Sequence, residues 1–159
     1  NMVGGFCRKP KGYNNDEYFT LKSTWELIKD YIPKDKKIWE SFKGNGQSAT
    51  YLKELGFDVE CYDEDFFNSN HGEIIITNCP FSKKKQVLEY IFKLDKPFIM
   101  IMPCEVMNYK YLTPFHEHLQ LIIPKKRMKF LKDNEVVKFN YDCIFFCWKM
   151  KLKRDLIFV

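Results

Sequence analysis

The sequence predicts an α/β domain in which a mostly parallel sheet is covered by helices on both faces. Short apolar runs alternate with helical patterns along the chain, and this alternation is typical of folds made of strand-helix-strand units. Two of the runs, 74–76 and 97–102, are apolar without a break, as are parallel strands buried on both faces. A length of 159 residues suits one domain, which we expect to span residues 17–159.

The chain before that domain differs in composition. Residues 1–16 are rich in glycine and asparagine and contain a proline, which predicts an irregular arm. The first helix is expected to have Thr20 as its N-cap and to end before Pro33. Its buried face is predicted from the helical spacing of Leu21, Trp25, Leu27 and Ile28.

The next segment has the pattern of a strand-helix-strand unit. Ile38 and Trp39 open a short strand, and a loop with two glycines follows at 42–46. We expect a helix at 47–55, closed by Gly56 at its C-terminus, and a second strand at 57–62.

The second half of the chain continues the alternation. A buried strand is expected at 73–77, a helix at 87–94 behind it, and further strands at 97–102 and 119–123. The last two apolar runs, 142–150 and 155–159, predict an antiparallel pair that closes the sheet.

The net charge of +5 comes from clusters of Lys and Arg that are interleaved with aromatic residues. This composition favours a polyanionic partner such as nucleic acid, and an ordinary solvated surface is the alternative. The candidate nucleic-acid contacts lie after two predicted strands and are Lys83, Lys84, Lys85, Lys125, Lys126 and Arg127.

Cysteine and histidine usage argues against disulfides and metal sites. The six cysteines include no Cys-x-x-Cys pair, and several lie in apolar runs, so we expect a reducing, cytoplasmic setting, or the host-cell cytoplasm for a viral protein. His71, His116 and His118 lack partners at zinc-ligand spacing, so no metal is expected. No apolar run approaches the roughly 18 residues of a membrane span, and no membrane partner is expected.

Two predicted strand ends carry residues suited to a nucleotide-like ligand. The strand at 38–39 is followed by an acid and two spaced glycines, which let the backbone approach a ligand closely. The next strand ends in acids, at the distance where Rossmann-like folds bind ribose hydroxyls. A plain turn and an acidic solvent loop are the structural alternatives. The candidate ligand residues are Glu40, Phe42, Gly44, Gly46, Asp63, Asp65 and Phe66.

A third candidate site, residues 77–82, follows the buried strand and therefore lies at the carboxyl edge of the sheet, where open α/β folds bind ligands. Asn78 has a side-chain carbonyl that can accept one N–H of an amine, and the backbone carbonyl of Cys79 can accept the other. Pro80 would stiffen that carbonyl, and Phe81 would stack on a base taken out of its helix. An Asn-x-Pro turn after a strand is the structural alternative.

In their order along residues 16–159, these motifs resemble those of the S-adenosylmethionine-dependent N6-adenine DNA methyltransferases, especially the short phage and virus members. The segment Tyr18-Phe19-Thr20 is similar to the start of that domain, and Glu40-x-Phe42-x-Gly44-x-Gly46 is similar to its cofactor motif. The acids that bind adenosine in the family correspond to Asp63 and to Asp65-Phe66. Its catalytic motif, Asp or Asn followed by two prolines and Tyr or Phe, corresponds to Asn78, Pro80 and Phe81.

The resemblance implies a class I methyltransferase fold, S-adenosyl-L-methionine as the cofactor, and methyl transfer to the N6 amine of adenine in DNA. It also adds Tyr18 and Thr20 to the cofactor residues. Cys79 and Leu21 depart from the family, which has proline at both positions. Because a residue that replaces proline still has the backbone carbonyl, we expect Cys79 to be tolerated as a packed thiol and not to act as a nucleophile.

Other functions remain open at this stage. Motifs of this type also methylate adenine in RNA and glutamine side chains in proteins. The departures at Cys79 and Leu21 would also suit an inactive relative that binds nucleic acid or a partner subunit. DNA is the expected partner, RNA is the alternative, and the recognition sequence, the strandedness of the substrate and the oligomeric state are not determined by the sequence.

Overall fold

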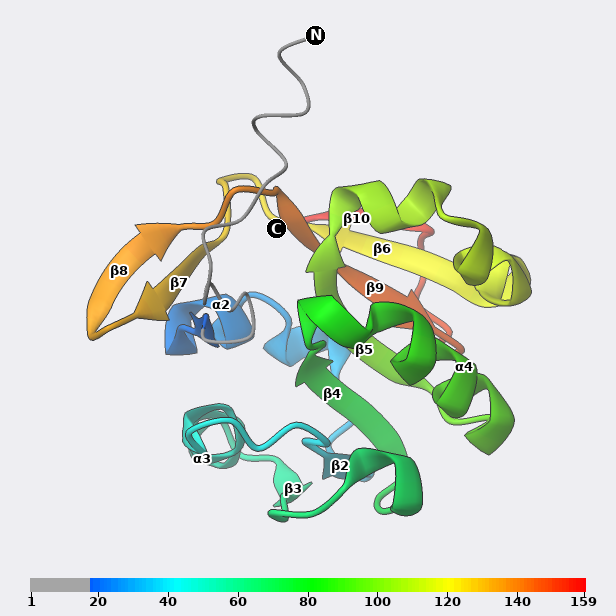
Figure 1. Ribbon diagram of the computed structural model, residues 1–159, viewed down its shortest axis with the longest axis horizontal. Helices are drawn as coiled ribbons and strands as arrows, with labels where there is room; N and C mark the ends of the chain where they lie inside the picture. The colour runs from blue at the N-terminus through cyan, green and yellow to red at the C-terminus, as the bar shows by residue number, and fades with distance from the viewer. Residues whose placement is uncertain (1–17) are drawn as a thin grey trace, which may run out of the picture.

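The structure, a computed structural model, describes residues 18–159, and the arm expected at residues 1–16 lies outside this range. Its centre is a seven-stranded sheet with the order β10-β6-β9-β5-β4-β2-β3 (Figure 1). Strand β9 runs antiparallel between β5 and β6, and the other six strands are parallel to one another. The strands are β2 (Lys37–Trp39), β3 (Asp58–Glu60), β4 (Ile74–Asn78), β5 (Phe98–Pro103), β6 (Leu119–Ile123), β9 (Cys143–Trp148) and β10 (Leu156–Phe158).

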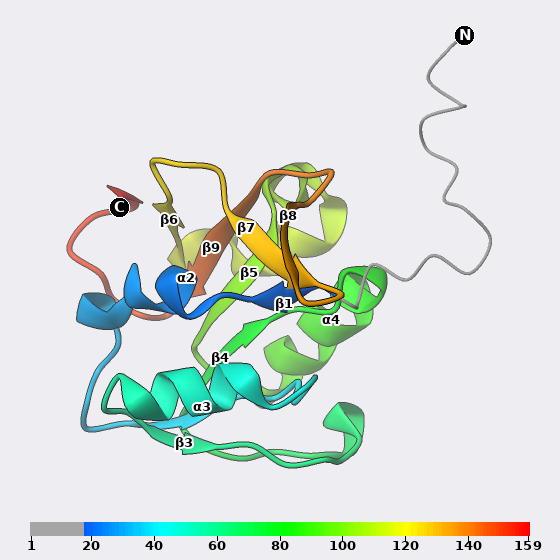
Figure 2. The same ribbon diagram turned by 90° about the vertical axis from the view of Figure 1, so that its left-hand side faces the viewer.

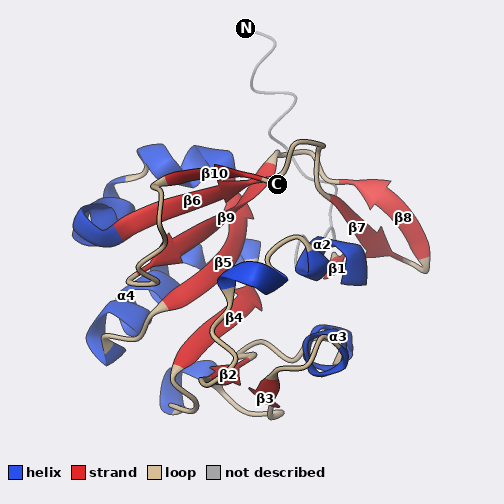
Figure 3. Ribbon diagram, turned by 180° about the vertical axis from the view of Figure 1, so that it is seen from behind, coloured by secondary structure: helices blue, strands red, loops and turns tan. Residues whose placement is uncertain are grey.

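Helices cover both faces of this sheet, as expected (Figure 3). One face packs against α2 (Lys22–Glu26) and α3 (Gln47–Glu54), and the other packs against α4 (Lys84–Leu94). Short 3-10 helices complete the fold: η2 (Lys29–Tyr31), η3 (Phe66–Asn68), η4 (Phe81–Lys83), η5 (Cys104–Asn108) and η6 (Lys110–His118). None of the helices within residues 18–159 is long and apolar enough to cross a membrane.

Alternation along the central strands divides the core into two layers. In β5, Ile99 and Ile101 face α2 and α3, whereas Phe98, Met100 and Met102 face α4. All five side chains are fully buried. A strand that is apolar at every position therefore contributes side chains to both layers of the core. This confirms the prediction of central strands buried on both faces.

A second, smaller sheet was not predicted. It has the order β1-β7-β8, with β1 at Phe19–Thr20, β7 at Lys129–Lys132 and β8 at Glu135–Lys138, and all of its pairs are antiparallel. The β7–β8 hairpin stands away from the main sheet (Figures 1 and 2). Its two-residue turn, Asp133-Asn134, has positive φ at both positions, which is the geometry that matches the twist of paired strands.

Two details of the predicted elements are wrong. Thr20 is not the N-cap of the first helix, because it is held in β1 by pairing with Phe130, and Leu21 takes the N-cap position without a side-chain hydrogen bond. The two C-terminal strands also do not pair with each other. Strand β6 lies between β9 and β10, so that β10 extends the parallel part of the sheet at its edge.

Candidate active site

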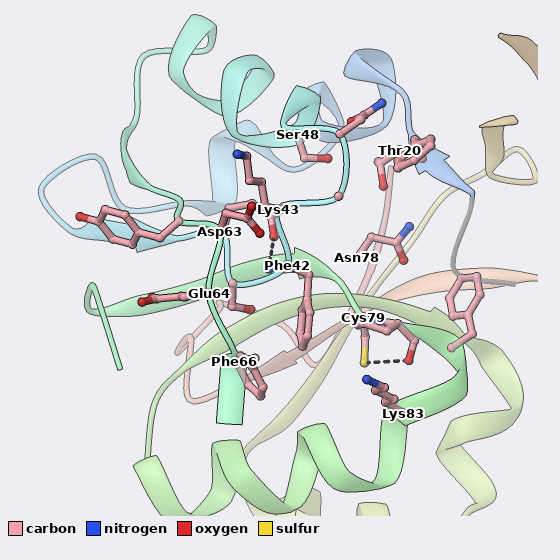
Figure 4. Close-up of a pocket in the computed structure, with 18 of the residues that line it drawn as sticks. Thr20, Phe42, Lys43, Ser48, Asp63, Glu64, Phe66, Asn78, Cys79 and Lys83 are labelled. Atoms are coloured by element: carbon pink, nitrogen blue, oxygen red, sulfur yellow. Dashed lines mark hydrogen bonds between the residues drawn. The ribbon is translucent and has the colours of Figure 1, made fainter. Parts of the chain in front are cut away.

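An open cavity of about 460 Å³ lies at the carboxyl ends of β2, β3 and β4 (Figure 4). In Figure 4, Asn78, Cys79 and Lys83 lie on one side of it, and Lys43, Asp63 and Glu64 lie on the other. We call it the strand-end cavity. Its lining includes most of the predicted site residues, namely Tyr18, Thr20, Glu40, Phe42, Gly44, Asp63, Asp65, Phe66, Asn78, Cys79, Pro80, Phe81 and Lys83.

The loop between β2 and α3 forms one wall of the cavity through its glycines. Gly44 has a φ of +54°, and a Cβ there would lie 3.3 Å from a ring carbon of Phe19, so a side chain would crowd β1. Gly46 is in the left-handed region at the N-cap of α3, and its N–H donates to the carbonyl of Lys43 at 2.8 Å. Gly46 does not line the cavity. Its role is to turn the chain into the helix, whereas Gly44 lies at the ligand space.

Glu40 is a buried carboxyl group that links two strand ends. It is 1% exposed, and its Oε1 accepts hydrogen bonds from the backbone N–H of Phe42 at 3.0 Å and from the hydroxyl of Thr77. Burial raises the pKa of Glu40 to about 8, and the two hydrogen bonds only partly oppose this shift. The end of β2 is thereby joined to β4 one residue before Asn78.

The two predicted ribose acids differ in what they contact. The carboxylate of Asp65 caps η3, accepting from the N–H of Phe67 at 3.1 Å and from the side chain of Asn68 at 2.5 Å. Asp63 is exposed at the cavity and makes no hydrogen bond or ion pair within residues 18–159. Asp63 is therefore the acid whose oxygens are available to a ligand, and Asp65 shapes the loop.

The acidic loop, residues 61–73 between β3 and β4, packs closely against β2 at its C-terminal end. Gly72 has a φ of +60°, and a Cβ there would lie 3.0 Å from the carbonyl oxygen of Lys37. The ammonium group of Lys96 donates to the carbonyls of His71 at 2.7 Å and Gly72 at 2.8 Å. Glu64 is paired with His71 at 2.5 Å. These contacts hold the end of the acidic loop near residues 71–72 against β2 and against Lys96, which follows α4, and they thereby position its acids beside the cavity.

Aromatic rings form the floor of the cavity on the same side. The rings of Phe42 and Phe66 have centroids 4.6 Å apart, and Phe66 stacks on Trp39 at 5.4 Å. Trp39 and Phe66 are almost completely buried. Packing from below fixes Phe42, which offers an apolar surface to a flat ligand.

Three buried polar atoms at the cavity lack a hydrogen-bond partner within the described residues. They are the side-chain oxygens of Thr20, Ser41 and Asn78. An unpaired buried acceptor or donor costs about 1 to 3 kcal/mol, and such atoms are rare in folded proteins. Three of them around one cavity indicate a polar ligand that supplies the missing partners.

The peptide after Asn78 is rigid and its thiol is packed. Cys79 is 1% exposed, its N–H donates to the carbonyl of Ile101 at 3.3 Å, and its Sγ lies 3.7 Å from the carbonyl oxygen of Pro80. That same oxygen accepts from the N–H of Lys83 at 3.0 Å. A buried thiol at this position agrees with the expectation of a packed residue.

Phe81 is less available than expected. It is 7% exposed, and its ring stacks on Phe139 with centroids 4.7 Å apart and planes at 30°. Lys84 lies over the ring at 6.0 Å. One face of Phe81 is thus occupied by the core, and its substitution would remove core packing together with any contact to a base.

The predicted basic contacts fall into two separate groups. Lys83 lines the cavity, and Lys85 pairs with Glu89 at 4.0 Å on the exposed face of α4. Lys125 lines a different groove beside β10, and Lys126 is exposed nearby. Arg127 is exposed but has partners within the fold: its guanidinium pairs with Asp142 at 2.8 Å and also donates to the carbonyl of Phe139.

Sequence reasoning missed several lining residues, including Ser41, Lys43, Asn45, Ser48 and Glu64. Ser48 accepts a hydrogen bond from the indole of Trp25 at 3.0 Å, which anchors α2 on α3. Ser41, Lys43 and Asn45 lie at the variable positions of the glycine motif, and Glu64 lies between the two predicted acids, so the motifs themselves do not select them. Within residues 18–159, no group of three or more His, Cys, Asp or Glu side chains is arranged to hold a metal ion.

No protein-family model matches the chain, and no curated protein matches it either. Solved structures do. A protein described as a class I S-adenosylmethionine-dependent methyltransferase from Listeria monocytogenes is 9% identical and matches with a TM-score of 0.55 over 99% of this chain and 69% of its own. A dimethyladenosine transferase from Plasmodium falciparum is 13% identical and matches with a TM-score of 0.51 over 82% of this chain and 62% of its own. The fold is therefore the Rossmann-like fold of class I methyltransferases.

Proposed function

We propose that this protein transfers a methyl group from S-adenosyl-L-methionine to the N6 amine of adenine in DNA. The observation that carries the proposal is the unpaired, buried side-chain oxygen of Asn78, which ends β4 at the strand-end cavity. An amide oxygen held there has no donor within the described residues, and an exocyclic amine would supply one.

The cofactor suits the other side of the cavity. The carboxylate of Asp63 is free to accept from ribose hydroxyls, and Phe42 offers a flat apolar surface to an adenine ring. Thr20 and Ser41 line the same cavity, and their buried hydroxyl groups have no hydrogen-bond partner within the described residues, so we assign the polar methionine end of the cofactor to this part of the cavity. When bound, S-adenosylmethionine supplies a methyl group already attached to a good leaving group.

The protein's own part in the reaction is alignment. Asn78 accepts one N–H of the amine, and the carbonyl of Cys79 accepts the other, so the nitrogen lone pair turns away from the ring and toward the methyl group. The link between Glu40 and Thr77 fixes β2 and β4 relative to each other, and it thereby sets the spacing between cofactor and acceptor. No proton has to leave before the new bond forms.

Two features support a nucleic-acid acceptor. Lys83 borders the cavity directly after the Asn78 segment. On the β7–β8 hairpin, Lys129 and Lys138 are directly opposite each other, an arrangement that is unfavourable unless an anion lies between or over the two charges. The name of the Plasmodium match, a dimethyladenosine transferase, supports an adenine amine as the acceptor.

The test is transfer of label from methyl-labelled S-adenosylmethionine to DNA, RNA and protein, with the product nucleoside identified by mass spectrometry. We expect N6-methyladenine in DNA. Label in RNA or in glutamine would overturn the choice of acceptor. Cofactor binding without any transfer, together with activity gained by Cys79→Pro plus Leu21→Pro, would identify an inactive relative.

A further inference from the structure

Two loops that carry tyrosines emerge beside the Asn78 segment, on the side opposite the strand-end cavity. Tyr109 and Tyr111 follow β5, and Tyr141 precedes β9. Because β5 and β9 are antiparallel and Pro103 pairs with Cys143, both loops leave the sheet at the edge where Asn78 ends β4. The cavity lies toward β2 and β3, and the tyrosine loops lie on the other side of β4.

Ring contacts connect one of these tyrosines, Tyr141, to Phe81 at the proposed acceptor site. Tyr141 lies 5.5 Å from Phe139, which stacks on Phe81. Tyr109 and Tyr111 have ring centroids 5.4 Å apart. The pKa of Tyr111 is raised to about 12, mainly by burial and also by the neighbouring Tyr109 and Cys79. Tyr141 is thus connected to Phe81 through Phe139, and Tyr109 and Tyr111 form a second aromatic pair after β5.

The tyrosines farthest from the core in this group of aromatic residues are exposed to solvent. Tyr109 is 37% exposed and Tyr141 is 40% exposed, with Met107 beside Tyr109 in sequence at 42%. By contrast, Phe81 and Phe139 are buried. Grouped exposed aromatic side chains on one rim indicate a binding surface more than a solvated one.

The charges around this rim favour an anionic partner with flat rings. Lys83 and Lys84 follow the Asn78 segment, and Lys110 is exposed between the two tyrosines of the first loop. The two acids nearby have partners: Glu105 interacts with the hydroxyl of Tyr109, and Asp142 pairs with Arg127 at 2.8 Å. The remaining lysines can meet phosphates.

We propose that Tyr109 and Tyr141 form a stacking platform for the bases next to the acceptor adenine, so that the substrate is an unpaired nucleic-acid strand. The proposal rests on the proposed function and narrows its substrate. Aromatic side chains stack on any base and give sequence-tolerant binding to single strands. In an intact duplex the faces of the bases are covered by their neighbours, and the tyrosines would have no surface to contact.

The test measures binding by fluorescence anisotropy, with the full chain, a labelled single-stranded oligonucleotide and the matching duplex. We expect the single strand to bind more tightly than the duplex. Tyr109→Leu and Tyr141→Leu should each weaken single-strand binding about 5-fold to 100-fold without changing the salt dependence. Tyr109→Phe and Tyr141→Phe should keep the affinity, because the ring and not the hydroxyl is required.

Phe158→Leu is the matched control, since Phe158 is 59% exposed on β10 at the far edge of the sheet, and it should bind like wild type. A second measurement needs no variant: an abasic strand of the same charge should bind wild-type protein more weakly than the normal strand does, and it should lose little or no further affinity in the leucine variants. Equal affinity for normal and abasic strands, or for duplex and single strand, would overturn the platform. Single-strand binding as expected but without methyl transfer to any nucleic acid would refute the proposed activity and leave the platform standing.

Discussion

At the scale of single residues, the site is characterised by polar atoms that the fold leaves unpaired. Asn78 could have satisfied its amide oxygen by facing solvent, yet the oxygen is buried at the end of β4. Ser41 and Thr20 show the same feature at the same cavity. Functional sites retain such costs because a bound ligand removes them.

Replacing Asn78 by alanine is predicted to abolish most of the activity and to leave cofactor binding intact. The lost acceptor acts on the amine in the transition state, and removal of a comparable preorganised group costs about 2.7 to 4 kcal/mol, or roughly 100-fold to 1,000-fold in kcat. Single-turnover rates and calorimetry with S-adenosylhomocysteine measure the two effects. Asn108→Ala, at an exposed position after β5, is the control. Weakened cofactor binding with an unchanged rate would remove Asn78 from the chemistry.

Glu40 should make stability depend on pH. Its pKa rises from 4.5 in the unfolded chain to about 8 in the fold, so between these values the unfolded state releases a proton that the folded state retains. Its contribution to the free energy of unfolding is therefore greatest below pH 4.5 and falls as pH rises toward 8, by up to about 1.4 kcal/mol per pH unit. Urea unfolding of Glu40→Gln should show a flatter profile, and the exposed Glu54→Gln should not. Identical profiles for wild type and Glu40→Gln would contradict the raised pKa.

At the scale of elements, the β7–β8 hairpin supports β1 at the cavity and carries a pair of facing lysines. It pairs with β1, which carries the cavity residue Thr20, and it projects away from the main sheet (Figure 1). Its lysines at 129 and 138 face each other. One small sheet therefore lines the cavity through Thr20 and carries the facing lysines to which the proposed function assigns phosphate contacts.

Charge reversal on this hairpin should move stability and nucleic-acid affinity in opposite directions. Lys138→Glu would pair with Lys129 and stabilise the hairpin by about 0.2 to 1 kcal/mol. The same change should weaken nucleic-acid binding and make the slope of log affinity against log salt shallower by about one unit. Thermal unfolding and binding titrations at several salt concentrations measure these effects. Lys153→Glu, in the separate groove beside β10, should leave the slope unchanged. If the slope of log affinity against log salt is also unchanged for Lys138→Glu, the lysines of the hairpin do not contact phosphates.

At the scale of the whole molecule, the sheet brings distant segments to one edge. β3, β2, β4 and β5 are neighbours in the order of strands, so the segments near residues 40, 63, 78 and 109, which follow β2, β3, β4 and β5, leave the sheet at the same edge. β9 runs antiparallel and carries Tyr141 back to the same edge. A ligand at this edge contacts segments that are separate in the chain, and its binding should stabilise the fold as a unit.

S-adenosylhomocysteine is therefore predicted to raise the melting temperature. At 100 times its Kd, a ligand that binds only the folded state adds about 2.7 kcal/mol, which corresponds to roughly 5 to 10 °C for a domain of this size. Asp63→Ala should weaken binding by about 1.5 to 3 kcal/mol and reduce the shift at the same ligand concentration. Asp58→Ala, an exposed acid on β3 outside the cavity, should behave like wild type. A full shift in Asp63→Ala would exclude this carboxylate from the cofactor site.

The sequence by itself determined the succession of the strands of the main sheet and placed the candidate site at the carboxyl edge of its parallel strands. Apolar runs such as 97–102 favour strands covered on both faces, and local glycine and acid motifs mark where the loops are. The sequence could not determine that β6 separates β9 from β10, or that Arg127 and Asp65 use their charges within the fold. It also could not determine that Phe81 stacks on Phe139 in the core or that Tyr141 contacts the ring of Phe139. These outcomes depend on contacts between residues far apart in the chain, and only the tertiary structure brings their competing partners within reach of one another.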